Sequence, residues 1–440
     1  MSSRGEMNGQ VSGGSIPREE RRGGAGFMPM NRQAPRILLY SHDTFGLGHI
    51  RRTLSIAWGL AGAFPRASLL CLTGSPRAHA FPMPDCMDYL KLPAVTKDAE
   101  GRYVSRTANL SFRRILALRS EVIDSAIRTY KPDAILVDHA PLGMGGELLR
   151  ALRRARRERP ETRVILGLRD IIDEGNLIRA AWQREGIHKL IDEIYDRVLV
   201  YGQKSVFDVE REYDLDGTTA KKLEYTGYVY HEERAAHPHE TIRARHGLNG
   251  DPLVVLTVGG GEDGHRIVEK YLEGLSSQGV PSWHSVIVLG PFMKGGLRKN
   301  LRDLAAKLPG VSLVDFTTRL RQYISEADAV VAMGGYNTLV EAIALGKRAV
   351  VLPRLAPRRE QLIRATRFAE RGLLRWLDPD RCAPGELLRT VDEALATPPS
   401  EAPGLDLRGV ACTVRVLSEL MGLPCETSDA ETPRPSAAMH

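Results

Sequence analysis

Glycine turns that follow apolar runs carry the residues of this 440-residue chain best suited to bind an anion and move a proton. The first, Ser41–His49 (SHDTFGLGH), leads from an apolar run into a helical pattern. Gly46 and Gly48 permit a tight turn, and the start of a helix presents N–H groups to an anion. His49 is expected on the first helical turn, where a neutral imidazole accepts a proton near pH 7. The alternative is an ordinary glycine turn with a solvent-exposed histidine.

Two further glycine turns lie in the second half of the chain. The apolar run Leu253–Val258 ends in three consecutive glycines: Gly259, Gly260 and Gly261. Such a turn exposes backbone N–H groups and can cradle a phosphate, although a merely flexible turn is equally consistent. No G-K-[ST] follows, so the turn is not a Walker A motif. The other turn, Gly334-Gly335-Tyr336-Asn337-Thr338, precedes a helix predicted over Leu339–Leu345 and suits a diphosphate through the helix dipole and free amides.

Polar side chains beside these turns are candidates for binding sugar hydroxyls. Glu341, about one turn into the predicted helix, is placed to reach a ribose, unless it is a solvated helix glutamate. In Pro353–Gln361 (PRLAPRREQ), Glu360 and Gln361 can hydrogen-bond a sugar, unless the segment is a basic surface loop.

In the first half, polar residues follow two more apolar runs. Asp138 and His139 end one run, and Arg169 and Asp170 end another. At the carboxyl end of a strand, either pair can position an acceptor hydroxyl. For Arg169 and Asp170 the alternative is a buried charge pair.

Short apolar runs alternate with helical patterns along the whole chain. In the first half, strands are predicted over Arg36–Ser41, Ala67–Thr73, Asp133–Asp138, Arg163–Leu168 and Arg197–Tyr201, with helical faces after Ile50 and over Leu110–Tyr130. In the second half they are predicted over Leu253–Val258, Ser285–Leu289, Val311–Asp315, Ala329–Ala332 and Ala349–Leu352. Consecutive apolar residues suit strands covered on both faces, so the sheets should be parallel.

The predicted fold is α/β, with two doubly wound Rossmann-like domains facing each other across a cleft. The expected boundaries are a disordered tail over 1–35, an acceptor-side domain over 36–230 and a linker over 231–250. A ligand-binding domain over 251–404, a helix over 405–421 and a disordered tail over 422–440 follow. In such folds ligands bind beyond the carboxyl ends of the strands, where the glycine turns lie.

The series Gly335, Glu341, Gly346, Pro353 and Gln361 resembles the donor-site signature of GT-B glycosyltransferases, above all the family 28 peptidoglycan N-acetylglucosaminyltransferases. The resemblance covers about Arg36–Met421 and is strongest over 311–361. It implies that the glycine turn meets a diphosphate, with Asn337 and Thr338 nearby. It further implies that Glu341 holds the ribose, that Gln361 contacts the donor sugar, and that Phe316 and Thr317 frame the base. Phe316 alone is equally consistent with core.

The first loop departs from that pattern. Gly48-His49-Ile50-Arg51-Arg52 is closer to the UDP-sugar hydrolase of pseudaminic acid biosynthesis, in which the histidine activates water. The second-half turn resembles a transferase, so water and a hydroxyl both remain open as acceptors. Asp43, Gly46, Gly48, Asp138, His139, Arg169 and Asp170 are assigned to the acceptor side.

Composition and charge restrict the protein class. An apolar fraction of 42% indicates a globular protein, and five scattered cysteines without a C-x-x-C pair argue against a disulfide framework. No apolar run approaches the ~18 residues needed to span a bilayer, and the start of the chain lacks the features of a secretory signal. The arginine-rich stretch 150–159 is either a solvated face or a contact with anionic lipid head groups. A net charge of +7 is too mild to argue for nucleic acid.

The sequence therefore predicts a cytoplasmic glycosyltransferase, alone or peripheral at the inner face of a membrane. The donor is a nucleotide-diphosphate sugar, expected to be UDP-linked, and the acceptor is a sugar or lipid-linked hydroxyl. His49 is the predicted base, with inversion at the anomeric carbon and neither cofactor nor metal. The alternatives are a nucleotide-sugar hydrolase and a non-catalytic nucleotide-sugar-binding protein, and no nucleic-acid partner is expected.

Overall fold

The computed structural model describes residues 34–43, 46–98, 102–215, 217–232, 240–248, 250–279, 281–398 and 404–424. The predicted tails lie almost wholly outside these ranges, as do the centre of the predicted linker and Thr44 and Phe45 of the first loop. All other predicted site residues are described.

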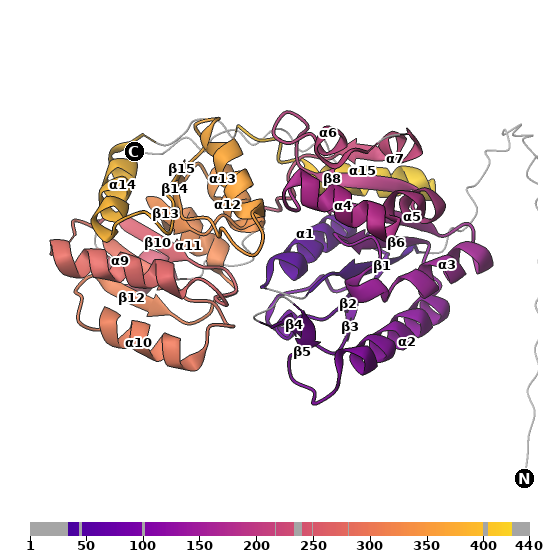
Figure 1. Ribbon diagram of the computed structural model, residues 1–440, viewed down its shortest axis with the longest axis horizontal. Coiled ribbons are helices and arrows are strands. Elements are labelled where there is room, and N and C mark those ends of the chain that lie inside the picture. Colours follow the sequence, from indigo (N-terminus) through magenta and orange to yellow (C-terminus); the bar gives the residue numbers. More distant parts are fainter. Residues whose placement is uncertain are drawn as a thin grey trace, which may run out of the picture. The chain divides into compact units, whose positions relative to one another are not determined.

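The first half is a seven-stranded parallel sheet in the order β3-β2-β1-β6-β7-β8-β9 (Figure 1). Its strands are β1 (Arg36–Ser41), β2 (Ser68–Thr73), β3 (Met87–Lys91), β6 (Ala134–Asp138), β7 (Arg163–Arg169), β8 (Arg197–Tyr201) and β9 (Leu223–Tyr225). Its helices are α1 (Gly48–Ala63), α2 (Phe112–Tyr130), α3 (Leu149–Glu158), α4 (Gly175–Glu185), α5 (Ile187–Ile194), α6 (Val209–Tyr213) and α7 (Gly217–Lys221). An antiparallel pair, β4 (Val95–Lys97) and β5 (Tyr103–Ser105), lies between β3 and α2 in the chain.

The second half is a six-stranded parallel sheet in the order β12-β11-β10-β13-β14-β15. Its strands are β10 (Leu253–Thr257), β11 (His284–Val288), β12 (Val311–Val314), β13 (Ala329–Ala332), β14 (Arg348–Val351) and β15 (Arg375–Trp376). Its helices are α8 (Ile242–Arg245), α9 (His265–Gln278), α10 (Gly295–Ala305), α11 (Leu320–Glu326), α12 (Tyr336–Ala344), α13 (Glu360–Ala369) and α14 (Pro384–Ala396). The predicted class, parallel sheets in two Rossmann-like halves, is confirmed.

Alternate residues of the central strands face opposite layers of helices, as both-sided burial requires. On β1, Leu38 packs with α2 and α3, whereas Leu39 packs with α1. On β10, Val254 packs with α9 and α14, whereas Val255 belongs to the same apolar cluster as Leu39. That cluster is therefore continuous through both halves.

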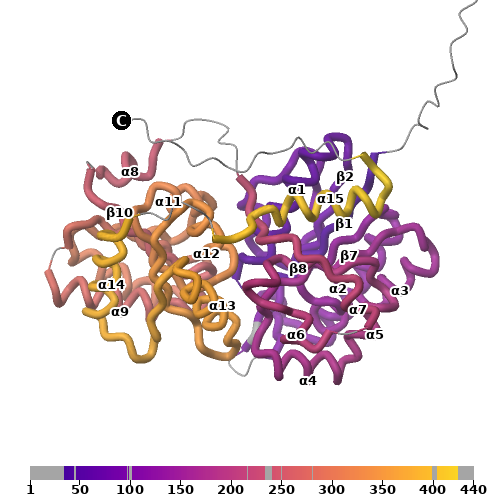
Figure 2. Tube along the Cα trace, turned by 90° about the horizontal axis from the view of Figure 1, so that it is seen from above, coloured from indigo at the N-terminus to yellow at the C-terminus, as the bar shows by residue number. Residues whose placement is uncertain are grey.

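The last helix, α15 (Gly409–Met421), packs on the first half of the chain. In Figure 2 it runs beside α1, and the two helices touch at Gly59, where an added Cβ would lie 2.2 Å from Val410 Cγ1. The main-chain carbonyl of Leu420 accepts a hydrogen bond of 3.0 Å from Arg163 at the start of β7. The end of the chain thereby closes one face of the first sheet.

The predicted strands match to within one residue at either end, but three predicted helix starts are wrong. The helices expected from Leu110 and from residue 405 begin at Phe112 and Gly409. The helix expected from Leu339 begins at Tyr336, because Gly335 has extended backbone angles and stands at the N-cap. Asn337 and Thr338 therefore lie in the first helical turn rather than in the loop. The short edge strands β3, β9 and β15 and the helices α4–α7 were not predicted, because they lack a continuous apolar run or a long amphipathic period.

Candidate active site

Residues of both halves line one cavity of about 180 Å³. Its walls include the start of α1, the turn after β10 and the start of α12. The sequence-predicted residues that line it are His49, Gly46, Gly48, Arg169, Gly259, Gly260, Gly261, Phe316, Thr317, Gly335, Asn337, Thr338, Glu360 and Gln361. Turns far apart in the sequence therefore meet where the resemblance expected one site.

His49 is oriented by a buried carboxylate. It follows Gly48, the first residue of α1, while Asp138 ends β6, the strand next to β1. His49 Nδ1 and Asp138 Oδ2 are 2.5 Å apart. Asp138 Oδ1 accepts two further hydrogen bonds from Arg52, at 3.0 Å from Nε and 2.6 Å from the nearer Nη. The three side chains form a buried triad in which Asp138 neutralises Arg52 and holds the imidazole.

The protonation states of this triad suit a general base. Burial lowers the pKa of His49 below its ordinary value, against an opposing effect of Asp138. Burial alone would raise the pKa of Asp138, but Arg52 and His49 hold it well below its usual range. At pH 7 the carboxylate is charged and the imidazole neutral, with its proton on Nδ1, which donates to Asp138. Nε2 is then free to accept a proton.

Two more histidines surround His49. The rings of His42 and His139 lie 5.5 and 5.3 Å from that of His49, centroid to centroid. Burial lowers the pKa of both well below the ordinary value. His139 has a left-handed backbone, with φ of 69°, which a residue other than glycine seldom adopts outside a constrained site. His42 was missed from the sequence, although it lies in the same loop as His49.

The start of α12 presents open space to the cavity. A Cβ built on Gly335 meets no atom within 4 Å, so a ligand can approach the backbone there. The next residue, Tyr336, also lines the cavity, and its hydroxyl donates to the main-chain oxygen of Tyr201 at 3.1 Å. Asn337 Nδ2 donates to the main-chain oxygen of Gly48 at 2.9 Å. The helix start that should receive a diphosphate is thus fixed against the loop that carries His49.

Two amides of the glycine turns are already occupied by groups of the chain itself. The amide of Gly46 donates to Glu262 Oε2 at 2.9 Å, and that of Gly261 donates to the carbonyl of Val258 at 3.1 Å. Added Cβ atoms would lie 2.8 Å from Gly46 Cα at Gly260 and 2.2 Å from the Leu289 oxygen at Gly261. Close backbone packing therefore requires glycine at positions 260 and 261. The expectation of a free amide is therefore wrong for Gly261.

Glu341 and Gly334 do not line the cavity within the described part of the chain. Glu341 is ion-paired with Arg51, and its second oxygen is buried. The carbonyl of Gly334 accepts from Arg364 at 3.3 Å. A contact between Glu341 and a ribose therefore requires Arg51 to move first.

The residues of the last predicted loop do line the cavity. Glu360 is buried and ion-paired with Arg354, while Gln361 Oε1 accepts from the amide of Arg354 at 3.0 Å. Phe316 lies edge-on to Phe81 at 6.3 Å between ring centroids. Phe316 is half-buried and lines the cavity, which favours the predicted contact with a ligand over a core position.

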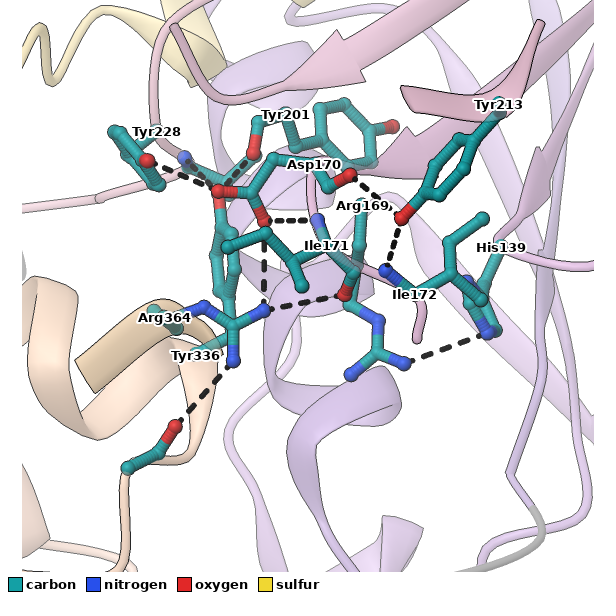
Figure 3. A network of polar contacts seen from close by, with 12 residues as sticks. His139, Arg169, Asp170, Ile171, Ile172, Tyr201, Tyr213, Tyr228, Tyr336 and Arg364 are labelled. Atoms are coloured by element: carbon teal, nitrogen blue, oxygen red, sulfur yellow. Dashed lines mark hydrogen bonds and ion pairs between the residues drawn. The ribbon is translucent and has the colours of Figure 1, made fainter. Parts of the chain in front are cut away.

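Arg169 and Asp170 do not form the buried charge pair that was the alternative interpretation of these residues. Figure 3 shows Asp170 directed to Arg364, 3.4 Å away, and to the hydroxyl of Tyr228, which donates at 2.9 Å. This buried network joins the two halves. Arg169 turns instead toward His139, whose Nε2 lies 3.4 Å from its guanidinium.

Asp43, Asp138, His139 and Asp170 do not line the cavity as far as the structure describes the chain. Asp43 is buried and accepts a hydrogen bond of 2.5 Å from the hydroxyl of Thr73. Of the residues assigned to the acceptor side, Gly46, Gly48 and Arg169 line the cavity, and the other four are buried behind it.

Residues 258–404 match the sequence model of the glycosyltransferase family 28 C-terminal domain. The chain is family 28-like. An uncharacterized glycosyltransferase of Methanopyrus kandleri is 27% identical over 184 residues, which are 41% of this chain and 49% of that protein. The UDP-N-acetylglucosamine--N-acetylmuramyl-(pentapeptide) pyrophosphoryl-undecaprenol N-acetylglucosamine transferase of Rubrobacter xylanophilus is 30% identical over 150 residues, 34% of this chain and 42% of that protein. The chain thus spans less than half the length of these curated relatives.

Solved structures share the fold at low identity. The kitacinnamycin glycosyltransferase superposes with a TM-score of 0.54 at 15% identity, over 89% of this chain and 97% of that one. The UDP-GlcNAc 2-epimerase of Neisseria meningitidis gives 0.56 at 14% identity, over 88% and 99%. These likenesses confirm the GT-B architecture.

Proposed function

We propose that the protein transfers a sugar from a UDP-linked donor to a hydroxyl acceptor, with inversion. One observation carries the proposal: the oriented base His49 and the open helix start at Gly335 line the same cavity from opposite halves. The family 28 match over 258–404 supports a nucleotide-sugar donor. The names of the curated relatives support transfer.

The proposed reaction is a single displacement. The acceptor hydroxyl attacks the anomeric carbon while His49 Nε2 takes its proton, and the bond from that carbon to the diphosphate oxygen breaks. The nucleoside diphosphate leaves with the electron pair. Backbone amides of the first turn of α12 face the developing negative charge, so this stabilisation comes from the chain itself and needs no metal.

The acceptor is proposed to be a sugar or lipid-linked hydroxyl. The printed name of the Rubrobacter relative includes an undecaprenol-linked acceptor, which supports a lipid-linked one here. Within the described ranges, every helix is too short or too polar to cross a membrane. Contact with an anionic membrane surface through α3 is part of the proposal.

The arginines of the stretch 150–159 have nearby acidic partners. The ion pairs join Arg150 to Glu121, Arg153 to Glu193, Arg154 to Asp124, Arg156 to Asp196 and Arg159 to Glu161. The pairs of Arg150 and Arg153 are exposed and worth at most about 1 kcal/mol each, so a lipid phosphate can compete for these two guanidinium groups. The pairing also suits a solvated face.

Nucleotide release distinguishes transfer from its rivals. With the preferred donor alone, a transferase should release nucleotide slowly, and a crude lipid and polysaccharide extract should accelerate it. Rapid release of nucleotide and free sugar without acceptor would show that the protein is a hydrolase, the alternative that the resemblance of Gly48–Arg52 suggests. Tight donor binding without any turnover would assign a non-catalytic sensor, and His49→Ala would then change nothing.

A further inference from the structure

Five arginines line the cavity, and four of them have a carboxylate partner. The pairs are Arg51 with Glu341, Arg52 with Asp138, Arg354 with Glu360 and Arg364 with Asp170. The fifth, Arg169 at the end of β7, has no carboxylate within 4.0 Å among the residues that the structure describes. Two more lining carboxylates, Asp263 and Glu262, are paired with Arg354 and Arg106, so neither compensates Arg169.

The surroundings of Arg169 disfavour its charge. Burial, together with the nearby charge of Arg52, lowers the pKa of Arg169 to about 10. Its Nε is buried and has no hydrogen-bond partner in the described part of the chain. The one side chain that it reaches, His139, is kept neutral by burial and by Arg169 itself. Desolvating a cation without pairing it costs folding free energy, so an external anion is the group that would stabilise it.

A second arginine approaches from the other half. Arg358, in the loop before α13, is near enough for its charge to lower the pKa values of His42, His139 and Arg169. It too has no ion-pair partner within the described residues.

We propose that Arg169 binds an anionic group of the acceptor, a phosphate or a carboxylate, beside the hydroxyl that His49 deprotonates. The proposal rests on the proposed function and adds the class of acceptor. The ring of His139, which Arg169 touches, lies 5.3 Å from that of His49, so the anion lies within a few bonds of the attacking oxygen. The planar guanidinium fork suits both oxyanions.

The same chemistry could come from the donor diphosphate. Arg169 belongs to the half that carries His49, whereas the helix start suited to the diphosphate belongs to α12. The anion is therefore assigned to the acceptor, and the titrations below separate the two sources.

The first test is thermal unfolding of the full chain. Arg169→Met removes a half-buried cation that has no ion-pair partner among the described residues, so the melting temperature should stay the same or rise. The matched comparison, Arg52→Met, should lower it, because Asp138 then loses its buried partner. A clear loss of stability in Arg169→Met would show a structural role and overturn the proposal.

The second test is calorimetric titration of inorganic phosphate into protein saturated with UDP. Arg169→Gln should weaken phosphate binding about 10- to 100-fold, the effect of losing a charge-assisted hydrogen bond, and leave UDP affinity unchanged. Arg358→Gln should weaken phosphate binding less. Its neighbour Arg359, exposed and ion-paired with Glu174, supplies the control Arg359→Gln, which should bind like wild type.

Three results would overturn the assignment. They are an unchanged phosphate affinity in Arg169→Gln, an equal loss of UDP affinity in that variant, and no phosphate binding by wild type at tens of millimolar. The second would assign the anion to the donor. If wild type does not bind UDP, the proposed function fails instead, and phosphate titration of the nucleotide-free protein decides the arginine site alone.

Discussion

Replacing Asp138 with asparagine removes one negative charge from the triad with His49 and Arg52 and hardly changes its shape. If the new amide turns its NH₂ group toward His49 Nδ1, the imidazole proton moves to Nε2, which can then no longer act as a base. General-base assistance is typically worth ~10²–10⁴-fold, so turnover should fall by about that factor. Arg52, whose side chain is 2% exposed, also loses its partner, which should cost about 3–5 kcal/mol of folding free energy.

A double-mutant cycle makes the reasoning testable. Turnover is measured as nucleotide release with acceptor extract for His49→Ala, Asp138→Asn and the double variant, and donor affinity by calorimetry. Because the two residues act as one unit, the double variant should be no slower than the slower single variant, and donor affinity should not change. Asp133→Asn, at the other end of the same strand and half-exposed, is the control and should retain activity.

The coupling would be refuted if the two losses multiplied in the double variant. Full activity of Asp138→Asn, with the expected loss of stability, would show that the carboxylate serves Arg52 alone.

Three further predictions concern the donor turn, the arginine helix and the histidine cluster. Gly335→Val should abolish nucleotide-sugar binding in calorimetry, because the branched side chain enters the open space at the start of α12; unchanged affinity with an intact fold would remove the donor assignment. Binding to anionic vesicles in co-sedimentation should weaken with salt and in Arg153→Glu/Arg157→Glu, and indifference to both would exclude α3 as the contact. Burial keeps the folded-state pKa values of His42, His49 and His139 below the unfolded value of ~6.5. The unfolded chain therefore takes up more protons below that pH, and each histidine should remove up to ~1.4 kcal/mol of stability per pH unit; urea unfolding between pH ~7.5 and ~5.5 that shows no slope would contradict this.

The sheet strands were predictable because burial on both faces leaves an unbroken apolar run. Arg36–Ser41 and Arg197–Tyr201 coincide with the observed strands for that reason. The edge strand Met87–Lys91 alternates in exposure and carries two charged residues, so no run marks it. The start of α12 was placed too late because Tyr336 and Asn337 are poor helix formers, and only the N-cap geometry of Gly335 reveals the boundary.

The parts of the site that lie at the ends of strands could be predicted from the sequence. The ion pairs between its carboxylates and arginines could not. Topology alone brings the turns at Gly48, Gly260 and Gly335 to one cavity. Which carboxylate takes which arginine depends on side-chain reach between segments far apart in the sequence. Arg51 is 290 residues from Glu341, and Arg364 is 194 from Asp170. No local pattern encodes these choices, so the unpaired state of Arg169 emerges only from the structure.

The packing of α15 on α1 has a consequence for biosynthesis. The first half does not complete its own surface, because Gly59 on α1 is covered by Val410 and Val414, and a β-bridge joins Val229 to Arg408. In a nascent chain that has emerged only to the end of β9, the surface of α1 around Gly59 is still uncovered and accessible to chaperones at the ribosome exit. Folding of the first sheet is therefore completed after translation reaches the last described helix, and a stop codon before residue 409 should yield an aggregation-prone product rather than a free-standing half.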